Sequence, residues 1–202
     1  MLNSEMQSID IIAYDAYVEE IVLGKVSKTM DVPFQNIIHA AMGLCTEAGE
    51  LIEAIQKWDM INIREELGDI LWYLTLLKSA LDRHRVIDYF AHVKAVASSL
   101  SSFDTPLISG LRFVKASSEL LDTVKKGTFY GKGLNEALLY SQLCKCHAIT
   151  VSMANTICNC SMEHIMVMNT EKLRKRYETS FTPDEANNRN LGVERETLKN
   201  QN

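Results

Sequence analysis

The chain has 202 residues, of which 47% are hydrophobic and 23% are charged, a composition that excludes a mainly disordered protein. Its formal net charge of −5 provides no general attraction to DNA or to an anionic membrane, so we expect neither nucleic acid nor a membrane as a partner. No segment has the apolar run of a signal peptide or a membrane span, and the odd number of cysteines, 5, predicts free thiols in a cytoplasmic protein.

Turn residues are scarce, with 9 glycines and 3 prolines, which argues against an all-β sandwich or barrel. Apolar residues instead recur at helical spacing along most of the chain, so the sequence predicts an all-α protein. The predicted helices, in chain order, span residues 8–28, 31–57, 62–82, 85–98, 106–126, 134–158 and 162–177. A short helix or turn is predicted from residue 182, and the asparagine-rich tail from residue 187 is predicted to be partly irregular.

Several helix ends carry capping signals. Asn62, with Glu65 three residues later, has the pattern of a capping box for the third helix. Pro106 suits the first position of the fifth helix, and Ser161 is placed to cap the seventh. Before Pro106, the polar residues 99–105 form the best candidate linker.

The order of the predicted helices suggests an internal duplication. Gly43–Trp58 can be aligned with Arg112–Gly127, and Glu65–Leu77 with Ser141–Met153, with few identities but a matching hydrophobic phase. Between its two aligned segments the second copy has a longer loop, the glycine-rich residues 127–133. The alignment predicts two repeats, although two unrelated pairs of amphipathic helices would also match in phase.

Two pairs of acidic residues lie on successive predicted helices. Glu47 and Glu50 are three residues apart on the second helix, and Glu66 and Asp69 on the third, so each pair shares one helix face. If the helices pack antiparallel, four carboxylates converge, and Mg²⁺ or Mn²⁺ would relieve their repulsion. The alternative is an ordinary solvated acidic face.

A glycine precedes the last acid of each pair. Gly49 and Gly68 both lie in the middle of a predicted helix, where glycine costs about 1 kcal/mol relative to alanine. We expect the missing Cβ to allow close approach of a substrate or of a partner helix.

The sequence EAGE followed by ELGD resembles the E-x-x-E…E-x-x-D pattern of the MazG-like all-α nucleoside triphosphate pyrophosphohydrolases. Ile38–Leu77 is similar to the core of that family. Lys125–Gly133 and Asn169–Asn190 are similar to its substrate-side segments, especially in phage-type members. The resemblance implies a helical, usually oligomeric enzyme that hydrolyses a nucleoside or deoxynucleoside triphosphate to the monophosphate and pyrophosphate with Mg²⁺.

The resemblance also implies roles for particular residues. The four acids would be metal ligands, with Glu47 or Glu50 accepting a proton from the attacking water. Residues expected to bind phosphate lie on one helix face: Asn169, Lys172 and Arg176. Weaker candidates for nucleotide contacts lie in and beside the glycine-rich loop: Lys126, Tyr130 and Lys132. Trp58 is either a ring that stacks on the base or a core residue.

The second repeat departs from the family pattern. Ala116, Gln142 and Lys145 replace three of the four acids, and only Glu119 survives, so we expect Lys145 to pair with Glu119 in place of a metal. The resemblance then predicts a fused pseudo-dimer with one composite site. Its metal-binding repeat would be residues 1–103 and its degenerate, substrate-side repeat residues 104–202. A second repeat that serves only for packing is the alternative, and a homodimer of fused chains is possible.

Two further interpretations compete with these. Cys144 and Cys146 suggest zinc, but they point to different sides of one predicted helix, so buried thiols explain them better. For the whole chain, the alternative to an enzyme is a non-catalytic nucleotide-sensing or partner-binding helical protein. The complete acid set in the first repeat favours the enzyme.

Overall fold

The computed structural model describes residues 32–81, 89–100, 104–177 and 190–199. Within these ranges the chain forms seven helices and no strand, which confirms the all-α prediction. The helices are α2 (Val32–Lys57), α3 (Met60–Leu81), α4 (Tyr89–Ser98), α5 (Pro106–Phe129), α6 (Glu136–Thr156), α7 (Met162–Arg176) and α9 (Leu191–Lys199). The helix predicted over residues 8–28 and the turn predicted from residue 182 lie outside the described residues.

Most helix ends agree with the sequence signals. Pro106 begins α5 after Thr105, whose Oγ1 accepts a hydrogen bond from the Ile108 amide at 3.3 Å. Ser161 caps α7 through a bond from the His164 amide at 3.2 Å.

The capping box predicted for the third helix is wrong. Helix α3 begins at Met60, and its cap is Asp59, whose Oδ1 accepts hydrogen bonds from the amides of Ile61 at 3.2 Å and Asn62 at 3.3 Å. Trp58 has a left-handed φ of 53°, which ends α2 and leaves Asp59 as the first residue able to cap the next helix.

Part of the tail that the sequence predicts to be partly irregular, Leu191–Lys199, forms helix α9, which the sequence analysis did not predict. Asn190 caps this helix by accepting a hydrogen bond from the Val193 amide at 3.2 Å. Helix α9 is polar, and tertiary contacts hold it. Arg195 bonds to Asp59 at 2.9 Å and to Asn62 at 2.7 Å, beside the turn between α2 and α3.

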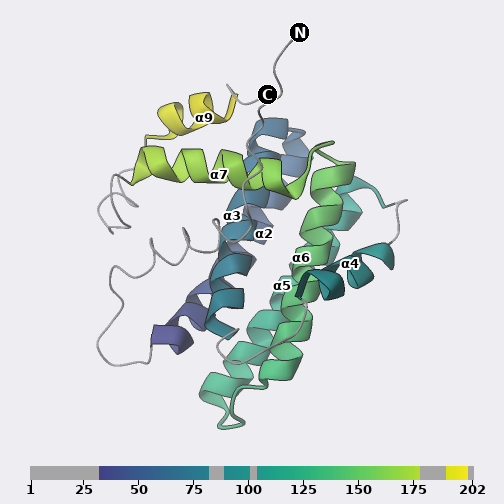
Figure 1. The fold of residues 1–202 in the computed structure, drawn as a ribbon, viewed down its shortest axis with the longest axis vertical. Coiled ribbons are helices and arrows are strands. Elements are labelled where there is room, and N and C mark those ends of the chain that lie inside the picture. Colours follow the sequence, from purple (N-terminus) through teal and green to yellow (C-terminus); the bar gives the residue numbers. More distant parts are fainter. Residues whose placement is uncertain (1–31, 82–88, 101–103, 178–189, 200–202) are drawn as a thin grey trace.

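The four long helices form two antiparallel hairpins, α2–α3 and α5–α6, that pack with α2 against α5 and α3 against α6 (Figure 1). Their turns lie at opposite ends of the molecule. Buried aliphatic and aromatic side chains from both hairpins form one continuous core, which includes Leu44, Leu51, Leu67, Ile70, Phe113, Leu120, Leu143 and Ile149. None of the described helices combines the length and the apolar character needed to cross a membrane.

Helices α4 and α7 each pack against the hairpin from the other half of the chain. Helix α4 follows the first hairpin in sequence but packs against α6, where Tyr89 Oη lies 2.7 Å from His147 Nδ1. Helix α7 follows the second hairpin but packs against α3 (Figure 1). Each half therefore covers the other, as a pseudo-dimer would. The duplication itself and the boundary near residue 103 stay predictions.

The two glycines beside the acids have different surroundings. A Cβ at Gly68 would lie 2.9 Å from Asn169 Cβ and 3.1 Å from Asn169 Nδ2, so this glycine lets α7 approach α3. A Cβ at Gly49 would meet no atom within 4 Å. The expected close approach of a partner helix is therefore confirmed at Gly68, and at Gly49 no described helix approaches.

Alanine substitution should consequently have opposite effects at the two glycines. Gly68→Ala should destabilise the protein by about 1–3 kcal/mol, because α7 must move away from α3. Gly49→Ala should stabilise it by up to about 1 kcal/mol, because an exposed helical position gains a better helix former without a clash. Chemical denaturation of the two variants measures both effects, and equal changes would contradict the close packing of α7 on α3.

Candidate metal centre

The four predicted acids project from two adjacent antiparallel helices. Glu47 and Glu50 come from α2, and Glu66 and Asp69 come from α3. Carboxylate oxygens of Glu47, Glu66 and Asp69 all lie within 4.8 Å of one another, and no other such group of ligand side chains occurs among the described residues. Glu66 is buried, Glu47 and Asp69 are half-buried, and Glu50 is exposed at the edge of the cluster. The predicted convergence of the acids is therefore present, with Glu50 outside the tightest group.

Crowding and burial disfavour ionisation of these acids. Burial raises the pKa of Glu47 to about 7, with a further contribution from the charges of Asp69 and Glu50. Burial, followed by the charges of Asp69 and Glu47, raises the pKa of Glu66 to about 9. A divalent cation reverses this preference, because it favours the ionised form of each oxygen ligand.

Helix α7 provides the cation and the amide that face the acids. Lys172 is fully buried, and its Nζ lies 2.7 Å and 2.6 Å from the two oxygens of Asp69 and 3.4 Å from Glu65 Oε1. Asn169 Nδ2 donates to Asp69 Oδ1 at 2.7 Å. Although burial opposes the charged form of Lys172, the carboxylates of Asp69 and Glu65 hold its pKa above the usual value. Two of the three residues predicted to bind phosphate thus contact a predicted metal ligand.

Arg176, the third of these residues, is held by α9. Its Nε and Nη2 donate to Glu194 Oε1 and Oε2 at 3.0 Å and 2.5 Å, a two-pronged ion pair in which Glu194 is buried. The assignment of Arg176 to phosphate stays a prediction.

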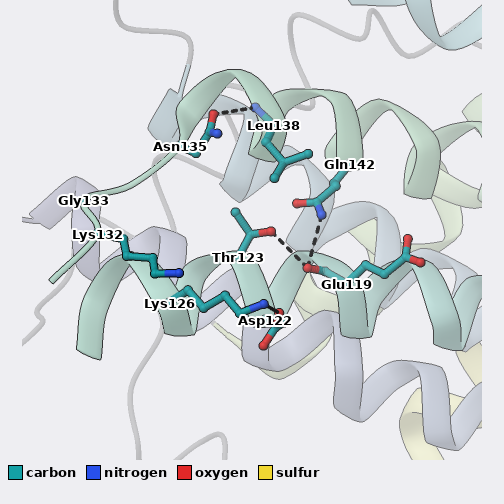
Figure 2. Close-up of a pocket in the computed structure, with 10 residues that line it drawn as sticks. Glu119, Asp122, Thr123, Lys126, Lys132, Gly133, Asn135, Leu138 and Gln142 are labelled. Atoms are coloured by element: carbon teal, nitrogen blue, oxygen red, sulfur yellow. Dashed lines mark hydrogen bonds and ion pairs between the residues drawn. The ribbon is translucent and has the colours of Figure 1, made fainter. Parts of the chain in front are cut away.

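The remaining predicted nucleotide contacts lie elsewhere. Lys126 and Lys132 line a separate pocket between α5 and α6, and none of the four acids lines that pocket. Tyr130 and Trp58 are 59% and 60% exposed, so Trp58 is not the core residue that was its alternative role. The structure therefore places Lys126 and Lys132 in a pocket (Figure 2) away from the acids, and the assignment of all four residues to substrate stays a prediction.

Sequence reasoning missed Glu65 as a site residue, and it considered Tyr73 only as a core residue or a ring that stacks on the base. Glu65 is the second carboxylate beside Lys172. Tyr73 is half-buried, and its ring fills the space beside Gly43, where a Cβ would lie 2.3 Å from the ring. Burial and the nearby charge of Glu47 raise its pKa. Both residues lie four positions, about one helical turn, from Asp69. This i, i+4 spacing is the sequence signal that could have identified them as neighbours of the acid cluster.

The equivalent positions of the second half contain the predicted ion pair. Lys145 Nζ lies 3.0 Å from Glu119 Oε2, and Gln142 Nε2 donates to the Glu119 carbonyl at 3.2 Å. The pairing of Lys145 with Glu119 is thus confirmed. Cys144 and Cys146 are buried thiols, as the sequence predicted.

The family model of the MazG nucleotide pyrophosphohydrolase domain matches residues 35–100. The matched segment contains α3, α4 and nearly all of α2, and with them all four acids. The match supports nucleotide pyrophosphohydrolase activity in general terms. Comparisons with curated proteins and with solved structures found no match.

The raised pKa values predict how the stability of the metal-free protein depends on pH. The protonated form of Glu66 favours folding, since its pKa is about 9 in the folded protein against an ordinary value of 4.5. This stability is complete below about pH 4.5 and is lost as the pH rises toward 9. Between pH 5 and pH 9 in EDTA, we expect wild type to lose roughly 2 kcal/mol or more, or about 4–8 °C in melting temperature.

Glu66→Gln should flatten this dependence in thermal melts. Glu53→Gln is the matched control, because Glu53 is an exposed acid that pairs with Lys57 on the neighbouring helix α2. An unchanged slope in Glu66→Gln would contradict the electrostatic origin of the pH dependence.

Proposed function

We propose that this protein hydrolyses a nucleoside or deoxynucleoside triphosphate to the monophosphate and pyrophosphate, and so controls a nucleotide pool. The observation that carries the proposal is the convergence of Glu47, Glu66 and Asp69 within 4.8 Å on two helices of the segment that matches the MazG domain. Oxygen-only ligands of this kind suit a hard cation better than they suit zinc or copper.

The residues present fit Mg²⁺, for which Mn²⁺ would substitute. Glu47, Glu50, Glu66 and Asp69 would hold the metal. Burial, and after it the charges of the neighbouring acids, raises the pKa of Glu47 and of Glu66, and a bound cation would favour their ionised forms. Bound Mg²⁺ would offset the charge of the triphosphate and lower the pKa of the attacking water toward neutrality.

The side chains of the protein would perform the remaining steps. Either Glu47 or Glu50 would accept the proton that the attacking water loses. Lys172, which pairs with Asp69 and Glu65, would turn its ammonium toward phosphate oxygens when substrate arrives, while Asn169 orients Asp69. A cation that leaves a carboxylate for a phosphate offsets the charge that develops on the leaving pyrophosphate.

This arrangement supports the composite site. The acids belong to the first predicted repeat, residues 1–103, whereas Asn169 and Lys172 belong to the second, residues 104–202. In this proposal the degenerate second repeat contributes to the site and is more than packing.

The first test of the proposal is turnover. The protein should be incubated with the common nucleoside and deoxynucleoside triphosphates and Mg²⁺, and pyrophosphate should be separated from phosphate among the products. Glu66→Gln should reduce activity about tenfold or more, because it removes a charged ligand at nearly constant shape. Glu53→Gln should retain full activity. Nucleotide binding without any turnover would instead support the non-catalytic sensor.

The second test asks whether Mg²⁺ can replace the positive charge that Lys172 supplies to Asp69. Lys172→Met leaves Asp69 without its buried partner, which should cost about 3–5 kcal/mol in EDTA. Because Mg²⁺ then supplies the missing positive charge, it should raise the melting temperature of Lys172→Met more than that of wild type. Lys172→Arg retains a cation and should respond as wild type does. Equal Mg²⁺ shifts in Lys172→Met and wild type would contradict the proposed exchange.

A further inference from the structure

Two cysteines lie one residue apart in the turn that joins α6 to α7. Helix α6 ends at Thr156 and α7 begins at Met162, so Cys158 and Cys160 both belong to the turn. Both are free thiols, and Cys158 is buried whereas Cys160 is half-buried. Neither the match to residues 35–100 nor the proposed function assigns a role to this pair.

The backbone of the turn brings the two cysteines close together. Asn159, the residue between them, has a left-handed φ of 50°. A residue in this conformation holds the Cα atoms on either side of it roughly 5.5 Å apart, whereas an extended residue separates them by about 6.5–7 Å. Because a disulfide requires a Cα–Cα distance of about 4.4–6.8 Å, the turn places the pair within range of one.

The end of α6 holds the turn in this shape. The Cys160 amide donates a hydrogen bond to the Ala154 carbonyl at 3.2 Å. The Ile157 amide donates to the Met153 carbonyl at 2.8 Å. The two thiols are therefore kept near each other before any reaction, and little entropy is lost when a bond joins them.

The two thiols differ in how readily they ionise. Hydrogen bonding to Cys158 holds the pKa of Cys160 below its ordinary value, although burial opposes the charged form. The same interaction raises the pKa of Cys158, and burial raises it further. Cys160 is therefore the thiol that loses its proton first, while Cys158 keeps its own and can donate it.

Arg64 of α3 supplies positive charge beside the pair. Its guanidinium favours the ionised form of both Cys158 and Cys160. Arg64 Nε is buried and has no hydrogen-bond partner among the described residues. A thiolate in the turn would offset the charge of this guanidinium. Cationic, partly exposed surroundings of this kind are those in which cysteines react.

We propose that Cys158 and Cys160 form a modification site, at which a hydroperoxide such as hydrogen peroxide oxidises the two thiols to a disulfide. Cys160 is the residue that reacts with the peroxide, and Cys158 is the residue that completes the disulfide. The site is separate from the acid cluster, and the proposal does not depend on the hydrolytic activity.

The reaction has two steps. The Cys160 thiolate attacks one oxygen of hydrogen peroxide, so that an S–O bond forms, the O–O bond breaks and hydroxide leaves. The Cys158 sulfur then attacks the sulfur of the resulting sulfenic acid. The S–S bond forms, the S–O bond breaks, and the hydroxyl group leaves with the Cys158 proton as water. The peroxide is reduced by two electrons, and the two thiols are oxidised.

Peptide mass spectrometry of the reduced full chain, treated with hydrogen peroxide near pH 7.5, tests the proposal. We expect a peptide that has lost two hydrogen atoms at Cys158 and Cys160 and regains them with dithiothreitol. Cys45 is the control within the chain, because it is also half-buried but burial raises its pKa. Cys160 should be oxidised about threefold or more faster than Cys45, since its larger thiolate fraction outweighs its lower intrinsic nucleophilicity.

Three variants separate the roles of the residues. Cys158→Ser should stop the reaction at the sulfenic acid of Cys160, which dimedone captures. Arg64→Met should slow the oxidation of Cys160 about twofold or more, because it removes the positive charge beside the thiolate. Arg64→Lys retains that charge and should react at nearly the wild-type rate. Circular dichroism checks that each variant is folded.

Three results would overturn the proposal. The first is oxidation of Cys160 that is no faster than oxidation of Cys45. The second is a wild-type chain in which the sulfenic acid persists, or in which Cys160 forms its disulfide with a cysteine other than Cys158. The third is an equal rate in wild type, Arg64→Met and Arg64→Lys, which would show that the surroundings of the pair do not activate it.

Discussion

The ion pair between Lys172 and Asp69 joins the two halves of this protein at the candidate metal centre. A fully buried ammonium from α7 contacts both oxygens of a carboxylate on α3, and Glu65 is its second acidic neighbour. A buried charge is tolerated only when it is paired, so α7 cannot leave α3 without a large electrostatic cost. Gly68 makes the contact possible, because it removes the Cβ that would collide with Asn169.

The same ion pair offsets part of the negative charge of the acid cluster when no metal is bound. Glu47, Glu66 and Asp69 are too close to be ionised together in a partly buried site. Lys172 offsets one of these charges, and burial, followed by the charges of the neighbouring acids, raises the pKa of Glu47 and of Glu66. Such a cluster lowers the stability of the metal-free folded protein, and the proposed function supplies the reason, since a cation and a triphosphate would bind there.

The two halves neutralise their buried and half-buried acids in different ways, although each half contains a similar antiparallel helix pair. In the first half Glu47, Glu66 and Asp69 lie close together, and the cation that pairs with Asp69 comes from the other half. In the second half Lys145 stands where an acid is expected and neutralises Glu119 directly. The acids of the first half would need a further cation if all of them are ionised, whereas Glu119 and Lys145 in the second half neutralise each other.

The sequence alone determined the helices and the pairing of acids on their faces, because periodicity and i, i+3 spacing are local properties of a helix. It also predicted the Lys145–Glu119 contact, since aligned positions on packed helices face one another. Only the tertiary structure decided that Lys172 is buried against Asp69 and that Arg176 is held by Glu194. It also formed α9 from a polar segment and separated Lys126 and Lys132 from the acids. These features depend on contacts between residues far apart in the chain, and the free energy of such contacts leaves no local pattern in the sequence.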